Sequence, residues 1–202
     1  GCGIIETKFK STSIDSIAVI DDGKYNVLNL NDCPFDLAKE AIEVILKEYK
    51  NIDYLLVGYR GAGPYPQCFE LPDDERLIAE ESKKIQFLSQ GEKYIKLVNP
   101  KFYMPFAGDY NLAGNLSKLQ NKRGVTELDE AGRYFSNSSL INHELSKNVL
   151  LNTYESFDLA TQKQSKKYIP IDMVKKEAYI ENVLSKRKLD YELDDEPSID
   201  EL

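Results

Sequence analysis

The pattern of apolar and polar positions begins with two short apolar runs, residues 14–20 and 24–30, on either side of Asp21-Asp22-Gly23. Runs of this kind around a short Asp/Gly turn are typical of a β-hairpin, with Gly23 at a positive φ. From Leu37 to Tyr49, apolar residues then recur every three or four positions. This spacing predicts a helix of about 14 residues whose single apolar stripe covers a sheet.

The alternation of strand and helix patterns continues to residue 106. Residues 52–59 form a nearly unbroken apolar run, which is typical of a buried strand. Residues 60–66 contain too much glycine and proline for a regular element. Residues 73–98 predict a long helix, and residues 101–106 predict another strand. On one face of the long helix we expect Ile78, Ile85, Leu88 and Ile95. The order strand, helix, strand, helix, strand predicts an α/β fold.

Signals for regular structure are weaker after residue 115. Residues 127–135 predict a short helix and residues 149–151 a short strand. Asp172 is placed to cap a helix that runs to about Lys188. We therefore divide the chain into a strand-and-helix region (1–115), a mixed and mainly helical extension (116–189) and an acidic tail (190–202).

The charge of the chain is concentrated in that tail. The net charge is −8, and residues 190–201 hold seven acids and no base, so the rest of the chain is nearly neutral. Acidic blocks of this kind are usually solvated. No face rich in Lys and Arg stands out, which argues against nucleic acid as a partner.

Cysteine content and hydropathy indicate the compartment. Cys2, Cys33 and Cys68 are an odd number without the spacing of a metal site, and we expect them in a reducing cytoplasm. No apolar run approaches the roughly 20 residues that a membrane-spanning helix needs. The sequence also lacks a signal-peptide pattern, so we predict a cytoplasmic protein with no membrane contact.

Asp32 is the first candidate for chemistry. It follows a predicted strand and precedes a predicted helix, a place from which a carboxylate can reach a metal or a substrate. The alternative is structural, because Asn31 and Asp32 could simply cap the helix. Position alone does not decide between these roles.

Arg60 is the second candidate, because it opens the glycine-rich loop after a buried strand. A guanidinium there could hold a phosphate or carboxylate; the alternative is a surface arginine or a structural ion pair. The turn at 107–110, where Gly108 permits close backbone approach, could line a pocket. His143 is the one histidine of the chain and fits an exposed loop position. A hydrolytic zinc site usually needs several histidines, which this chain cannot supply.

Three segments in fixed order, 16–33 (SIAVIDDGKYNVLNLNDC), 55–66 (LLVGYRGAGPYP) and 101–110 (KFYMPFAGDY), resemble a known family. They are similar to the later part of the metallo-β-lactamase-like region of CMP-N-acetylneuraminate hydroxylases. The resemblance covers roughly residues 14–115. It implies the C-terminal half of a four-layer αββα sandwich, whose metal-binding histidine motif would lie in an absent first half.

The resemblance also implies roles for individual residues. Asp32 matches the family aspartate that bridges two metals, so it would bind a divalent zinc or iron ion in the parent protein. Arg60, Gly61, Gly63 and Tyr65, together with Phe106 and Gly108, would contact an anionic substrate such as a sugar nucleotide. In the hydroxylases a separate Rieske iron–sulfur domain carries out oxidation, and its Cys/His pairs are missing here.

We therefore expect a fragment of a metal-dependent, hydrolase-like or sugar-nucleotide-modifying enzyme that is inactive as an isolated chain. Half of a sandwich would leave a sheet face open, so the expected partner is the missing N-terminal half-domain or a second copy. The competing hypothesis is a non-catalytic α/β module that binds a ligand or a protein.

Overall fold

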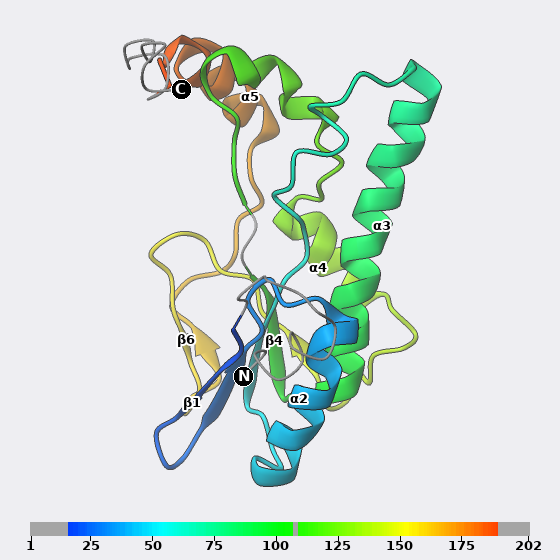
Figure 1. Cartoon of the computed structure of the whole chain (residues 1–202). Helices are drawn as coiled ribbons and strands as arrows, with labels where there is room; N and C mark the ends of the chain where they lie inside the picture. The colour runs from blue at the N-terminus through cyan, green and yellow to red at the C-terminus, as the bar shows by residue number, and fades with distance from the viewer. Residues whose placement is uncertain (1–15, 107–108, 190–202) are drawn as a thin grey trace, which may run out of the picture.

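The computed structural model describes residues 16–106 and 109–189. Their centre is a five-stranded, mostly parallel sheet with helices packed on one face (Figure 1). The predicted hairpin is confirmed, because β1 (Ala18–Asp21) pairs antiparallel with β2 (Asn26–Asn29) and Gly23 has φ 83°. The α/β class predicted from the alternating pattern is confirmed as well.

The remaining strands of this sheet follow in chain order and are parallel to β2. They are β3 (Tyr54–Val57), β4 (Phe102–Pro105) and β5 (Lys147–Asn148). β5 ends just before the strand predicted at 149–151, although the Val149 N–H still donates to the Tyr103 carbonyl. A second sheet has two short antiparallel strands, β6 (Phe157–Asp158) and β7 (Lys163–Gln164), which the sequence pattern did not predict.

Two long helices connect the parallel strands, α2 (Phe35–Glu48) and α3 (Asp73–Val98), close to their predicted bounds. The later helices are α4 (Leu128–Ser136) and α5 (Met173–Asn182), with 3₁₀ segments η1 (Gly114–Lys122) and η2 (Leu184–Lys186). The Asp172 carboxylate accepts a hydrogen bond from the Lys175 N–H at 3.1 Å, so the predicted cap is confirmed. α5 ends at Asn182, earlier than predicted.

No helix in the described part of the chain is long and apolar enough to cross a membrane.

Alternation of side chains along the strands divides the core into two clusters, one on each face of the sheet. On the helix-covered face, Leu28, Leu55 and Tyr103 are neighbours across three strands and are fully buried. On the opposite face, Tyr54 and Phe102 pack against Phe157 of β6, with ring centroids 5.5 and 4.8 Å away. The β6–β7 hairpin therefore covers part of the second face.

The prediction of one apolar face along α3 is only partly right. Leu88 and Ile95 are buried, whereas Ile78 and Ile85 are 67% and 53% exposed. A 26-residue helix is about 39 Å long, three times the length of a four-residue strand. Its N-terminal part therefore extends past the sheet, toward the end of the molecule that holds α5 (Figure 1).

The finer fold expectation, a half of an αββα sandwich, finds no support in these contacts. The layers that the structure describes are helices, one five-stranded sheet and a small hairpin. β5 lies within the predicted extension, yet it pairs with β4 of the strand-and-helix region. The predicted acidic tail, 190–202, lies outside the described residues.

Tyr54 generates a prediction about stability at high pH. Burial raises the pKa of its hydroxyl well above the ordinary value of 10.0, and the oxygen has no hydrogen-bond partner among the described residues. Above pH 10 the unfolded chain therefore loses this proton while the folded chain keeps it. Stability should fall by up to about 1.4 kcal/mol per pH unit for this group.

Urea unfolding at pH 7, 10 and 11 checks this expectation. Tyr54→Phe should match the parent chain at pH 7 or exceed it slightly, and its advantage should grow as the pH rises above 10. An advantage that is the same at all three pH values would contradict the assignment.

Candidate functional site

A pocket of about 390 Å³ lies at the carboxyl ends of β2 and β3, the edge where open α/β sheets commonly bind ligands. The loops after these two strands and one face of α3 form its walls. The lining residues are Asn31, Asp32, Pro34, Gly58, Arg60, Gly61, Ala62, Gly63, Gln86, Phe87 and Gln90. We call this hollow the edge pocket.

The wall between loop and helix depends on the absence of a side chain at Gly61. A Cβ atom there would lie 2.1 Å from the Cζ atom of Phe87, so the Phe87 ring packs directly on the loop backbone. On the other side, the Gln90 Oε1 accepts a hydrogen bond from the Phe35 N–H at 3.3 Å, which joins α3 to the start of α2. These contacts fix the two loops relative to α3.

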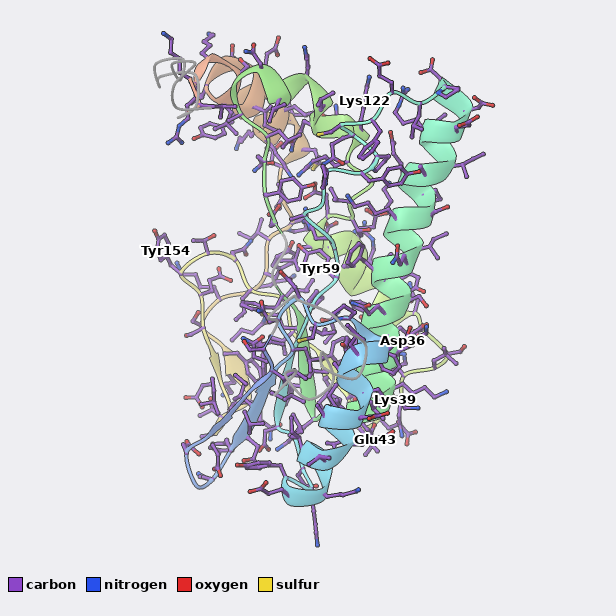
Figure 2. All side chains as sticks on the ribbon, viewed as in Figure 1. Asp36, Lys39, Glu43, Tyr59, Lys122 and Tyr154 are labelled. Carbon is purple, nitrogen blue, oxygen red and sulfur yellow. The ribbon has the colours of Figure 1, made fainter. Side chains whose placement is uncertain are left out.

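Among the described residues, Arg60 is the one cation that lines the edge pocket, and it is buried at 4% exposure. Its Nη2 donates to the Tyr59 hydroxyl at 2.7 Å, and the guanidinium carbon lies 4.8 Å from the Tyr59 ring centroid. Burial, the largest effect, raises the pKa of Tyr59 to about 12, so its hydroxyl is neutral at physiological pH. Tyr59 lies near the middle of the molecule (Figure 2).

Two carboxylates compensate the Arg60 charge. The Nη1 atom lies 3.0 Å from Asp109, whose side chain is 48% exposed, and Nη2 lies 3.8 Å from the less exposed Glu127. The structural ion pair considered from the sequence is thus present. The Nε and Nη1 atoms, however, are buried and have no hydrogen-bond partner among the described residues, since the Asp109 contact is an ion pair only. An unpaired buried donor costs about 1–3 kcal/mol, and a water molecule or ligand commonly satisfies it.

A network of charges connects this arginine to the C-terminal part of the chain. The Glu127 carboxylate also accepts a hydrogen bond from the Lys176 ammonium of α5, with Nζ 2.6 Å from Oε1. Arg123 is buried, donates to the carbonyls of Gln120 and Tyr110, and lies 4.7 Å from the Tyr110 ring centroid. Burial lowers the pKa of Arg123, as does the nearby charge of Arg60. The positive charges of this network thus outnumber its two carboxylates.

A second hollow of about 500 Å³ adjoins the edge pocket and is lined by Gly63, Pro64, Tyr65, Glu75, Ile78, Ala79, Ser82, Lys83, Gln86 and Phe87. We call it the apolar pocket. Lys83 is 8% exposed and donates to the carbonyls of Gly63 at 3.2 Å and Tyr65 at 2.6 Å. Burial is the main cause that lowers the pKa of Lys83, and the nearby charge of Arg123 lowers it further. This lysine fixes the loop that separates the two pockets.

The structure places Asp32 on the wall of the edge pocket with an exposed side chain. It does not cap α2, because the helix starts after Pro34 and no side chain caps its first turn. No group of three or more His, Cys, Asp or Glu residues able to hold a metal occurs in the described ranges. The metal role of Asp32 therefore remains a prediction.

The other predicted site residues divide into three groups. Arg60, Gly61 and Gly63 line the edge pocket with Asp32, while Tyr65 lines the apolar pocket. The Phe106 N–H donates to the Val57 carbonyl at 2.8 Å, and this residue lines neither pocket. Gly108 lies outside the described residues.

Sequence reasoning missed the contribution of α3. Gln86 and Gln90 are one turn apart and therefore share a helix face, a signal that the sequence does contain. Nothing in the sequence indicates that this face lies opposite Asn31 and Arg60. His143 is an exposed turn residue, as predicted, and its Nε2 atom donates a hydrogen bond to the Ser138 carbonyl at 2.7 Å.

Comparison with known proteins gives one kind of similarity. The chain is 30% identical over 95 residues to proteins of Mycobacterium tuberculosis strains CDC 1551/Oshkosh and H37Rv, provisionally described as Rieske 2Fe-2S iron–sulfur proteins. The match covers 46% of this chain and 17% of the length of each relative. No family model matches the chain, and no solved structure matches it.

These findings correct the interpretation drawn from the sequence. The similarity is to proteins described as Rieske iron–sulfur proteins, not to a metallo-β-lactamase-fold hydrolase. The assignment to that superfamily is therefore wrong, and with it the expected hydrolase-like or sugar-nucleotide-modifying activity.

The link between α5 and the arginine generates a prediction. Lys176 is 11% exposed and pairs with Glu127, whereas the neighbouring Lys175 is 86% exposed and pairs with Asp172 at 3.6 Å. Lys176→Met should cost about 1–3 kcal/mol of unfolding free energy, because Glu127 would lose its closest cation. Lys175→Met should change it by less than about 0.5 kcal/mol. Equal effects in chemical denaturation would contradict the network.

Proposed function

We propose that this chain is a ligand-binding part of a larger iron–sulfur protein and takes an anionic small molecule in the edge pocket. The observation that carries the proposal is Arg60, a pocket-lining residue whose buried guanidinium has two nitrogens, Nε and Nη1, without a hydrogen-bond partner among the described residues. A carboxylate or phosphate is the chemical group that best satisfies such a donor.

The position of α2 supports an anion in the same pocket. Pro34 lines the pocket and α2 begins at Phe35, so the positive end of the helix dipole lies at this wall. The negative charge of Asp32, on the same wall, repels an anion. Because Asp32 is exposed, water and salt screen this repulsion. The volume of about 390 Å³ is within the range of small-molecule sites.

The iron–sulfur part of the proposal comes from the described relatives, and the cluster would lie outside this chain. A Rieske cluster needs two cysteines and two histidines. This sequence has one histidine, and Cys33 is buried while Cys68 is exposed. The residues present therefore do not fit the cluster. We further propose a cytoplasmic location, which an odd number of cysteines without metal-site spacing favours.

Titration of the chain with inorganic phosphate, followed by NMR, tests the pocket. Arg60→Lys keeps the charge but loses the guanidinium fork, so we expect phosphate binding to weaken at least about tenfold. Asp32→Asn removes a like charge and should tighten binding about two- to fivefold.

Arg133→Lys is the matched control. Arg133 is 66% exposed and pairs with Asp129 on α4, away from both pockets, so binding should not change. Thermal unfolding of each variant shows whether it is folded. Phosphate affinity that is absent in the parent chain, or equal in a folded Arg60→Lys variant, would refute the proposal.

A further inference from the structure

We infer that the anionic ligand also carries an apolar group, aromatic or alkyl, which occupies the apolar pocket. This inference rests on the proposed function and specifies the ligand class of the same site. The two pockets share Gly63, Gln86 and Phe87, so they form adjacent compartments on either side of one stretch of wall. A ligand held at Arg60 that reaches past these shared residues would enter the second compartment.

The two compartments differ in chemistry. The edge pocket is lined by Arg60, whose guanidinium is buried, and by the amide-bearing residues Asn31, Gln86 and Gln90. The apolar pocket is walled mainly by proline, tyrosine, isoleucine, alanine and phenylalanine side chains. Glu75 also lines it, which disfavours an anion there. An amphipathic ligand would thus place its charge at Arg60 and its apolar part beside Ile78.

Exposed apolar side chains in the second compartment support this orientation. Tyr65 is 47% and Ile78 is 67% exposed, although both line a concave surface. The Phe69 ring packs edge-on against Tyr65 at 5.4 Å between centroids, which helps to hold that ring in place. Covering such surface with an apolar ligand group is favourable in water.

Lys83 does not make this compartment an anion site. Its ammonium already donates to the carbonyls of Gly63 and Tyr65, and it is 8% exposed. Its contribution is to fix the loop whose residues form walls of both compartments. The ligand class that fits both is therefore a phosphate or carboxylate monoanion or dianion attached to a compact aryl or alkyl group.

Calorimetric titration of the full chain with inorganic phosphate, phenyl phosphate and phenol tests the inference. Phenyl phosphate should bind at least about tenfold more tightly than phosphate, as expected for burial of part of a ring. Ile78→Ser should remove most of this gain and leave phosphate binding unchanged. Ile85→Ser is the matched control, since Ile85 is 53% exposed on the same helix and lines neither pocket.

The outcomes separate this inference from the proposed function. If phosphate and phenyl phosphate bind equally and Arg60→Lys weakens both, the anion site stands and the apolar compartment is refuted. A gain that persists in Ile78→Ser refutes it as well. If neither anion binds, the proposed function fails and the inference fails with it. Phenol that binds as tightly as phenyl phosphate would show that the anion contributes nothing, which refutes both.

Discussion

The close packing of α3 on the carboxyl end of β3 is the constraint on which the rest of the site depends. A Cβ atom at Gly91 would lie 2.7 Å from Phe135 and 3.2 Å from the Gly58 carbonyl, so only glycine lets helix and strand approach this closely. Phe87 lies against the backbone at Gly61 in the same way. These contacts bring the α3 face and the β3 loop together as the two walls of the edge pocket.

Burial of Arg60 follows from this packing and has an electrostatic cost. A guanidinium removed from water needs nearly every donor satisfied. The Tyr59 hydroxyl accepts a hydrogen bond from Nη2, Asp109 and Glu127 compensate the charge at ion-pair distance, and Lys176 of α5 pairs with Glu127. The C-terminal elements are thus part of the electrostatic surroundings of the pocket. A donor left unpaired after this much compensation is the reason to regard the pocket as a binding site.

The sequence predicted the order of the main elements well, because its signals are local. The apolar stripe of α2 and the Asp172 cap each depend on residues a few positions apart. The exposure of Ile78 and Ile85 could not be predicted, because it depends on how far α3 extends past short strands. β6 and β7 were missed because two-residue strands carry almost no periodicity.

Chain position alone brings four of the predicted site residues to one pocket. Asp32, Arg60, Gly61 and Gly63 all follow parallel strands, and the carboxyl ends of parallel strands meet at one edge of the sheet. The charge network was missed because Glu127 and Arg123 lie more than 60 residues after Arg60 in the chain. No short motif encodes such a contact. The family resemblance, which rested on three strand-end motifs, gave the wrong superfamily.

The central claim is that the Arg60 Nε–H is completed by an anion. The most direct measurement follows the guanidinium Nε–H signals of Arg60 and Arg123 by ¹H–¹⁵N NMR while phosphate is added. Arg123 serves as the internal reference, since its Nε already donates to the Gln120 carbonyl at 2.7 Å. The account predicts that the Arg60 signal shifts and exchanges more slowly with water while the Arg123 signal stays. An Arg60 signal that is unchanged at saturating phosphate would contradict it.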